Sequence, residues 1–162
     1  MEQNMRVVSA KYVFDGVNLL TEKAVLIDGN TIIDVVDKNK VYDASQIEDF
    51  GDSVISAGLI DLQLNGCGGV LFNDSITLET LETMHQTNLR YGTTSYLPTL
   101  ITSAVADVMQ ALEVTKQWFK LYGNTRGVVG LHLEGPFLSV EKRGIHPLEF
   151  IIKPTDDLLA AI

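Results

Sequence analysis

The sequence predicts an α/β protein in which an all-β N-terminal zone is followed by alternating strands and helices. Residues 5 to about 60 carry short apolar runs separated by turn residues, which is typical of strands. Further along, two stretches with helical periodicity lie between apolar runs of strand type. This alternation favours a parallel sheet with helical connections, either a barrel or an open sheet.

Composition limits the classes of function. The 162 residues are 46% hydrophobic, which is enough for one domain with a real core. A net charge of −9 gives no basic face for nucleic acid and disfavours anionic membranes. The single cysteine, Cys67, cannot form an intrachain disulfide, which fits a reducing compartment. Without a signal peptide or an apolar run near the roughly 20 residues of a membrane span, we expect a cytoplasmic protein.

The first zone is expected to contain extended segments only. Gly29-Asn30 lies between two apolar runs and suits a two-residue hairpin turn with positive φ. The expected strands are 5–14, 23–28, 31–36 and an extended run from 54 to 64.

The second zone is expected to begin with a helix over 77–91, with Thr77 as its N-cap. A strand over 93–99 follows, and then a helix over 103–122 that ends at Gly123. The apolar face expected for this second helix consists of Val105, Val108, Met109, Leu112 and Phe119.

A short apolar strand over 127–133 suits a parallel sheet that is buried on both faces. Near the end of the chain, Pro154-Thr155-Asp156-Asp157 predicts a helix start. Only one turn of apolar residues follows, so we interpret the sequence as interrupted.

Residues at the ends of the strands are the candidates for chemistry, because α/β enzymes build their sites from loops at the carboxyl ends of parallel strands. Glu134 follows an apolar strand directly, so its carboxylate is either a metal ligand or acid/base group, or a structural acceptor of loop amides. Position alone leaves both open. The strand-end residues are Asp61, Gln63, Asn65, Thr99, His132 and Glu134.

The histidines and amides near these ends also allow more than one interpretation. His132 shares a strand face with Glu134, and a histidine satisfied within the sheet is favoured over a ligand. His146 lies in a loop, where a surface position is the first interpretation. Gln63 and Asn65 alternate where many metal hydrolases have His-x-His, and amides are poor zinc ligands, so fewer metals are expected.

The glycine-rich loop at 66–69 is weak evidence for phosphate binding, because it lacks the spacing of a P-loop. Its glycines favour a tight backbone path near the site instead. Cys67 has no basic residue beside it to lower its pKa, so a nucleophilic role is not expected.

Several segments together are similar to one enzyme family. They are Gly58-Leu-Ile-Asp-Leu-Gln-Leu-Asn-Gly-Cys-Gly-Gly-Val70 with Phe72-Asn-Asp74, Tyr96-Leu-Pro-Thr-Leu-Ile-Thr102, and His132-Leu-Glu-Gly-Pro-Phe137. In this order and spacing the chain resembles the N-acetylglucosamine-6-phosphate deacetylases of the amidohydrolase superfamily.

The resemblance implies a small β-sandwich attached to a (β/α)8 barrel. Residues 1–55 would be the sandwich portion, and 56–162 the first strands and helices of the barrel, incomplete at the C-terminus. The implied reaction is metal-dependent: activated water attacks the N-acetyl group of N-acetylglucosamine 6-phosphate and releases acetate and glucosamine 6-phosphate. One divalent ion of the zinc type and a homodimer are implied as well.

Residue by residue, the resemblance makes Glu134 a metal ligand and places Ile145 and His146 against the sugar substrate. Gln63, Asn65 and His132 would line the site. The family's other metal ligands and its catalytic aspartate come later in the chain, so the resemblance assigns no catalytic residue here. One carboxylate cannot hold zinc in a catalytic site.

We therefore expect these 162 residues alone to be inactive. Two alternatives remain: a non-catalytic fragment or binding module, and another amidohydrolase such as a cyclic-amide hydrolase.

Overall fold

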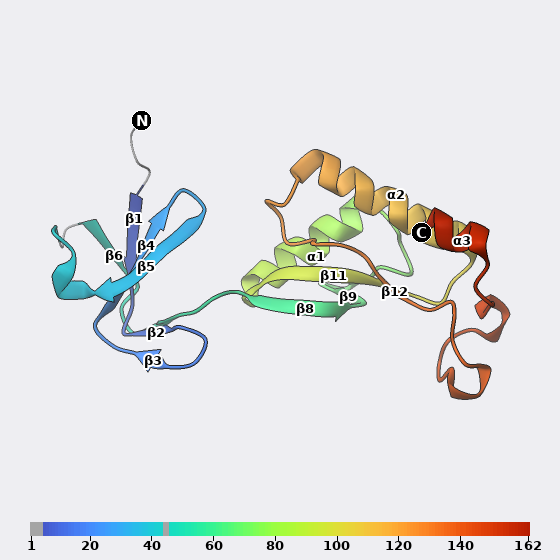
Figure 1. Cartoon of the computed structure of the whole chain (residues 1–162), viewed down its shortest axis with the longest axis horizontal. Coiled ribbons are helices and arrows are strands. Elements are labelled where there is room, and N and C mark those ends of the chain that lie inside the picture. Colours follow the sequence, from blue (N-terminus) through green and yellow to red (C-terminus); the bar gives the residue numbers. More distant parts are fainter. Residues whose placement is uncertain (1–4, 44–45) are drawn as a thin grey trace. The chain divides into compact units, whose positions relative to one another are not determined.

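The chain divides into two compact units, Met1–Ala57 and Gly58–Ile162 (Figure 1). The structure, a computed structural model, describes residues 5–43 and 46–162. Among these residues, no helix combines the length and the apolar character needed to cross a membrane.

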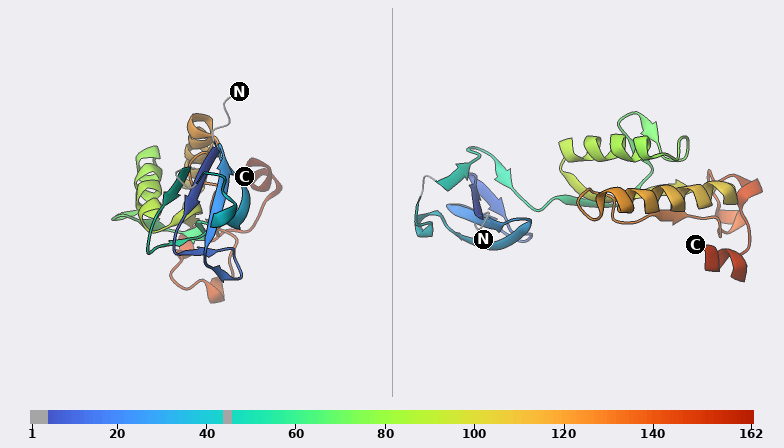
Figure 2. Two further views of the ribbon diagram at one scale, coloured as in Figure 1. Left: turned by 90° about the vertical axis from the view of Figure 1, so that its left-hand side faces the viewer. Right: turned by 90° about the horizontal axis from the view of Figure 1, so that it is seen from above.

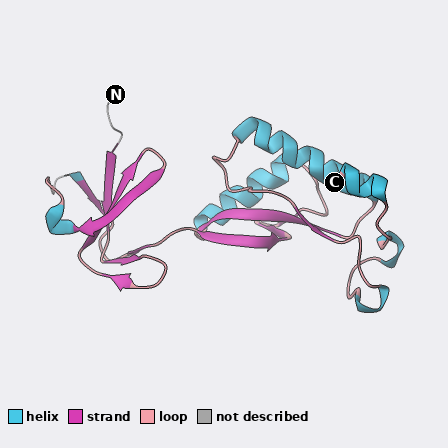
Figure 3. Cartoon of the chain, in the orientation of Figure 1, coloured by secondary structure: helices cyan, strands magenta, loops and turns pink. Residues whose placement is uncertain are grey.

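Two small sheets form the first unit, and the 3-10 segment η1 at Lys38–Lys40 follows the strand β5 (Figure 3). One sheet has the order β5-β4-β1-β6 and the other β3-β2-β7. In each, one pairing is parallel (β1 with β6, β2 with β7) and the others are antiparallel. The strands are β1 (Met5–Ser9), β2 (Tyr12–Phe14), β3 (Leu19–Leu20), β4 (Lys23–Asp28), β5 (Thr31–Asp37), β6 (Ile47–Asp49) and β7 (Val54–Ile55).

Side chains from both sheets form the core of this unit. Val8, Val13 and Val25 are buried together, and partly buried Ile27 and Ile55 pack against them. Because Val13 and Ile55 come from one sheet and Val8 and Val25 from the other, the two sheets share one small apolar layer.

The sequence predicted the hairpin of β4 and β5 well and the first strand of the chain less well. The 23–28 strand is found as predicted, and Gly29 has the positive φ (56°) that its turn requires. The single strand expected over 5–14 is wrong, because the chain crosses from one sheet to the other at buried Ala10 and forms β1 and β2. The two-residue strand β3 and the short strand β6 were not predicted.

The second unit has a parallel sheet in the order β12-β11-β8, with β11 in the centre. Helices α1 and α2 lie on the same side of this sheet (Figures 1 and 2). The elements are β8 (Leu59–Leu64), β9 (Gly66–Cys67), β10 (Val70–Leu71), α1 (Leu78–Arg90), β11 (Thr93–Ile101), α2 (Val105–Tyr122), β12 (His132–Glu134), η3 (Val140–Lys142), η4 (Leu148–Phe150) and α3 (Asp156–Ala161).

Caps and glycines fix the ends of several of these elements. The Thr77 hydroxyl accepts a hydrogen bond from the Thr80 N–H, as predicted for an N-cap, and Gly123 ends α2 with φ 55°. Thr155 caps α3 in the same way. The glycine-rich loop forms the hairpin of β9 and β10, in which Gly68 and Gly69 both have positive φ.

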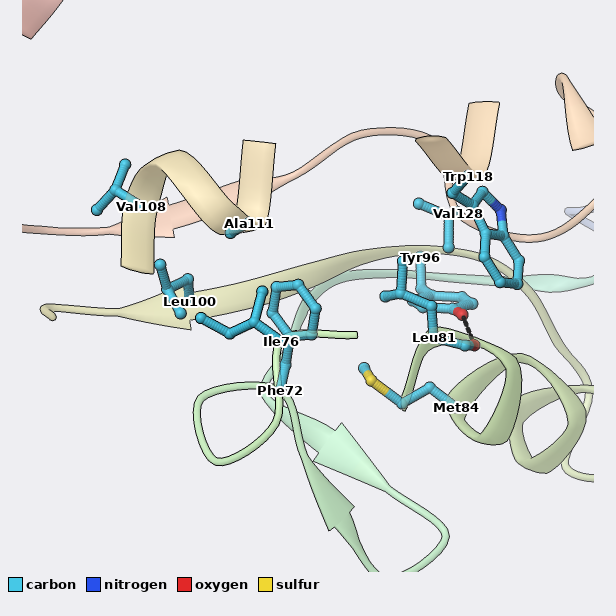
Figure 4. Close-up of a cluster of buried hydrophobic side chains, with 10 residues drawn as sticks. All are labelled: Phe72, Ile76, Leu81, Met84, Tyr96, Leu100, Val108, Ala111, Trp118 and Val128. Carbon is cyan, nitrogen blue, oxygen red and sulfur yellow. Dashed lines mark hydrogen bonds between the residues drawn. The ribbon is translucent and has the colours of Figure 1, made fainter. Parts of the chain in front are cut away.

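The core of this unit lies between the sheet and its two helices (Figure 4). Tyr96 of β11 and Trp118 of α2 are fully buried within it. The Tyr96 hydroxyl donates to the Leu81 carbonyl of α1 at 3.1 Å, which ties the helix to the central strand (Figure 4). Burial raises the pKa of Tyr96, so this hydroxyl stays protonated as a donor.

Two details of the prediction are wrong. On the face predicted for α2, Val105 and Met109 are more than 40% exposed, whereas Val108 is buried and Leu112 and Phe119 pack against the core as predicted. Ala111, Thr115 and Trp118 complete the buried face, because the helix turns its largest side chain into the core. The strand expected over 127–133, buried on both faces, is found only as β12, after one isolated bridge between Val128 and Tyr96. Val129 is exposed.

The described residues form a mixed α/β fold and contain no closed barrel. The three parallel strands leave the outer edges of β8 and β12 without a partner strand in this part of the chain. Leu59, Ile60 and Leu62 of β8 are each more than 60% exposed. A (β/α)8 barrel closes only with eight strands.

We predict that truncating a buried leucine of α1 destabilises the protein far more than truncating an exposed one. Leu81 is fully buried and Leu89 is 46% exposed on the same helix. Leu81→Ala should lower the free energy of unfolding by about 2–5 kcal/mol, because it leaves a cavity in the core. Leu89→Ala should cost less than about 1.5 kcal/mol. Urea denaturation measures both; equal costs would contradict the described core.

Candidate functional site

A pocket of about 370 Å³ lies at the carboxyl ends of the parallel strands. Segments far apart in the sequence build it: the end of β8, the loop after β10, the end of β11, Glu134 of β12 and the long loop that follows. Figure 1 shows that loop, in orange and red, beyond the arrowheads of β8 and β11. The lining residues are Gln63, Asn65, Leu71, Asn73, Asp74, Ile101, Glu134, Ile145 and His146.

Glu134 reaches the pocket because β12 ends there in register with β11. Glu134 pairs with Ile101, and its carbonyl accepts a hydrogen bond from the Thr102 hydroxyl at 3.2 Å. Its carboxylate side chain is 30% exposed and directed toward His146, with Oε1 3.6 Å from Nε2. The next residue, Gly135, has φ 104°, and a peptide bond in the cis form joins it to Pro136.

His146 is held on both sides of its ring. Its Nδ1 lies 2.9 Å from the Thr102 Oγ1, and its Nε2 faces Glu134. The side chain is only 12% exposed, so the surface position that the residue pattern alone favoured is wrong. Neighbouring Ile145 also lines the pocket but is 88% exposed.

Gln63 and Asn65 both line the pocket, as their alternation on one strand predicted. They bring to the pocket two neutral amides, each able to donate and accept hydrogen bonds. A pocket lined by two carboxylates, one imidazole and side-chain amides can bind a polar, multiply hydroxylated ligand.

Asn73 is a pocket residue that the residue-by-residue analysis did not single out. Its Oδ1 accepts from the Ile101 N–H at 3.0 Å, and its Nδ2 donates to the Ser103 Oγ at 2.9 Å and the Ile101 carbonyl at 3.3 Å. It therefore clamps the end of β11 beside Glu134. The signal was present in the Phe72-Asn-Asp74 run, whose Asp74 lines the pocket too.

His132 lies two residues before Glu134 on β12 but is not among the residues that line the pocket. Its Nδ1 is 3.2 Å from the Oγ1 of buried Thr99. The remaining strand-end residue, Asp61, accepts a hydrogen bond from the Gln63 N–H. Cys67 is outside the pocket lining, and burial raises the pKa of its thiol, which disfavours the nucleophilic thiolate.

The residues present do not fit a complete zinc centre. Within residues 5–43 and 46–162, no group of three or more His, Cys, Asp and Glu side chains could hold a metal ion. Glu134 and His146 are two candidate donors, whereas catalytic zinc uses three protein ligands and a water. The expected Zn ligand Glu134 thus has no complete ligand set in the described part of the chain.

The fold and the pocket define an α/β protein of the kind that places its functional residues in loops at the carboxyl ends of parallel strands.

No family profile matches the chain. It is 40% identical over 141 residues to the N-acetylglucosamine-6-phosphate deacetylase of Haemophilus influenzae, a match that covers 87% of this chain and 36% of that enzyme. It is 45% identical over 91 residues to the N-acetylgalactosamine-6-phosphate deacetylase of Shewanella sp., covering 56% and 23%.

Solved structures agree with this relationship. The N-acetylglucosamine-6-phosphate deacetylase of Pasteurella multocida superposes with a TM-score of 0.88 at 40% identity, covering 96% of this chain and 41% of that one. A mutant of the Mycobacterium smegmatis deacetylase, in complex with N-acetyl-D-glucosamine-6-phosphate, has the same fold, with a TM-score of 0.80 at 22% identity over 96% and 39% of the two chains.

The chain is thus homologous to the N-terminal portion of N-acetylglucosamine-6-phosphate deacetylases. It spans about 40% of the length of the relatives that it matches in this way.

We predict that Gly135 is required for the packing of Thr102 beneath the pocket. A Cβ at Gly135 would lie 2.0 Å from the Thr102 Oγ1, and φ 104° strains any other residue. Gly144 also has positive φ (60°), but a Cβ there meets nothing within 4 Å. Gly144→Ala should therefore cost about 1–2 kcal/mol of unfolding free energy from strain alone.

Gly135→Ala should cost at least about 1 kcal/mol more than Gly144→Ala, because the clash adds to the strain. Denaturant unfolding of both variants provides the measurement. A Gly135→Ala protein as stable as Gly144→Ala would show that Thr102 is not held against this backbone.

Proposed function

We propose that this chain forms the N-terminal part of a deacetylase that hydrolyses the N-acetyl group of N-acetylglucosamine 6-phosphate, releasing acetate and glucosamine 6-phosphate. One observation carries the proposal: Glu134 and His146 meet at 3.6 Å in a strand-end pocket of a chain homologous to these enzymes. Because the chain spans only part of its relatives, the activity is proposed for the whole enzyme and not for these residues alone.

The pocket suits part of an amino-sugar ligand in size and chemistry. Its volume, about 370 Å³, lies at the lower end of the range for small-molecule sites. The amides of Gln63 and Asn65 can exchange hydrogen bonds with hydroxyl or acetamido groups. The exposed Ile145 side chain offers an apolar contact at the pocket rim, and His146 offers a ring nitrogen deeper inside.

The sugar's phosphate group has no counterpart in this pocket. None of its lining residues is a lysine or arginine, and the chain's net charge is −9. Phosphate recognition depends on cationic or backbone N–H donors. We therefore propose that the described pocket faces the acetamido end of the substrate, and that the phosphate is bound by residues elsewhere in the enzyme.

In this proposal Glu134 contributes one ligand to the divalent metal, as the resemblance implies. The described residues do not complete that metal centre. The roles left to this chain are to orient the acetamido group and to keep Glu134 and His146 in fixed positions.

The match to the Shewanella enzyme favours a second candidate substrate, N-acetylgalactosamine 6-phosphate. The two sugars are epimers that share the acetamido and phosphate groups. The described pocket gives no contact that selects one of them, so the test includes both sugars.

The test is a chimera in which this chain replaces the segment that it matches in the Haemophilus influenzae enzyme. We expect the chimera to release acetate from N-acetylglucosamine 6-phosphate, measured by a coupled acetate assay. Glu134→Gln should lower kcat/KM by on the order of 100-fold or more. Glu149→Gln is the matched control, because Glu149 is exposed on η4 and outside the pocket, and should leave activity unchanged.

Two outcomes would contradict the proposal. A folded chimera with no activity on either sugar would argue against a deacetylase role, and an unchanged kcat/KM in Glu134→Gln would remove Glu134 from the site. The 162-residue chain alone is the second control and should release no acetate.

A further inference from the structure

A histidine outside the pocket is buried between the two helices of the second unit. His85 of α1 is only 7% exposed, and its ring meets the indole of Trp118 edge-on, with 6.1 Å between the ring centres. Trp118 of α2 in turn meets the ring of Tyr122 edge-on at 4.6 Å. His85 is not among the residues that line the pocket, so its surroundings are those of a helix–helix contact.

One ion pair closes this aromatic cluster. Arg126, in the segment after α2, pairs with Glu82 of α1, and its guanidinium lies 4.2 Å from the centre of the Tyr122 ring. Glu82 precedes His85 by three residues, which places both side chains on one face of α1. The cluster of Glu82, His85, Trp118, Tyr122 and Arg126 thus joins α1, α2 and the segment that follows α2.

The segment that Arg126 anchors leads into β12. The Gly127 carbonyl accepts from the Tyr96 N–H at 2.7 Å, and the Val129 N–H donates to the Tyr96 carbonyl at 3.1 Å. The same run of chain ends at Glu134, the last residue of β12, in the pocket. The ion pair of Arg126 therefore fixes the start of the run whose end lines the pocket.

His85 fits this cluster as a neutral ring. Burial lowers its pKa, because desolvation penalises the charged form; Glu82 opposes this shift, and Arg126 adds to it. The Glu82 carboxylate already accepts hydrogen bonds from Arg126 and from Gln86. A protonated His85 would leave this carboxylate facing two cations.

Two further titratable groups packed against α1 stay uncharged while a histidine titrates. The Cys67 thiol of β9 bonds to the Met84 carbonyl at 3.5 Å, and the Tyr96 hydroxyl of β11 bonds to the Leu81 carbonyl at 3.1 Å. Burial raises the pKa of both groups, so each remains protonated at neutral and mildly acidic pH.

We propose that His85 is an acid-sensitive switch in the contact between α1 and α2. As a neutral ring it packs against Trp118. When it takes up a proton, its charge repels Arg126 and competes for Glu82, and the start of the run into β12 loosens. This inference does not rest on the proposed function, because none of these four residues lines the pocket.

The direction of the pKa shift gives the pH range of the switch. A histidine with a lowered pKa in the folded state binds its proton more readily when the chain is unfolded. Its contribution to stability is therefore fully present above about pH 6.5, the ordinary histidine value, and is lost as the pH falls below it. We expect the switch to operate on the acid side of this value.

Trp118 reports the switch, because it is the only tryptophan of the chain and lies against His85. A protonated imidazole quenches indole fluorescence more strongly than a neutral one. The fluorescence of the 162-residue chain should fall in one step below about pH 6.5, while its far-ultraviolet circular dichroism stays unchanged. In ¹H–¹⁵N spectra, the backbone signals of Thr125, Arg126 and Gly127 should shift with the same midpoint.

Three substitutions separate the switch from other titrations. His85→Gln should abolish the fluorescence step. Glu82→Gln should move its midpoint to lower pH, because it removes the carboxylate that favours the charged ring. Glu79→Gln is the matched control, an exposed glutamate on the same helix, and should leave the midpoint in place.

A step that persists in His85→Gln would overturn the proposal. So would a wild-type fluorescence that changes only when the whole chain unfolds in acid. If His85→Gln does not fold, the wild type and Glu82→Gln decide, since an unmoved midpoint in Glu82→Gln also contradicts the switch. These measurements need no catalysis, so an inactive chimera would refute the proposed function and leave this inference standing.

Discussion

The parallel pairing of β11 with β8 on one side and β12 on the other determines where every pocket residue lies. The register places Pro98 opposite Leu64 and Ile101 opposite Glu134, so all three strands end at the same edge. Loops that leave this edge bring residues separated by 83 positions in the sequence into one pocket, from Gln63 to His146. The core beneath, with Tyr96 bonded to the Leu81 carbonyl, holds this pairing in place.

The same arrangement determines which polar groups the described residues bring to the pocket. They are two carboxylates, Asp74 and Glu134, an imidazole that contacts a buried threonine, and the amides of Gln63, Asn65 and Asn73. The described residues form no group of three His, Cys, Asp or Glu side chains that could hold a metal ion, and no lysine or arginine lines the pocket. The incomplete ligand set agrees with a chain that spans about 40% of the length of its relatives. The three exposed apolar side chains of β8 agree with this as well.

Much of the fold followed from the sequence where local signals were strong. The hairpin at Gly29, the cap at Thr77 and the end of α2 at Gly123 depend on a few neighbouring residues, and the structure has them as predicted. Predictions that depend on distant contacts were weaker. The buried face of α2 is set by where Trp118 fits in the core, and the strand over 127–133 is limited by its contacts with β11.

For the site, the strand-end rule and the family resemblance indicated Gln63, Asn65, Glu134, Ile145 and His146, and the structure brings these residues together. The roles of Asn73 and Thr102 could not be predicted, because both act through hydrogen bonds to residues about 30 or more positions away.

A crystal structure of the Glu134→Gln chimera with N-acetylglucosamine 6-phosphate bound would show directly which part of the sugar this pocket holds. We predict that the acetamido group lies in the pocket of Gln63, Asn65 and His146, with the phosphate directed away from it. A sugar bound elsewhere, or a phosphate group inside this pocket, would show that the pocket does not bind the acetamido end of the substrate.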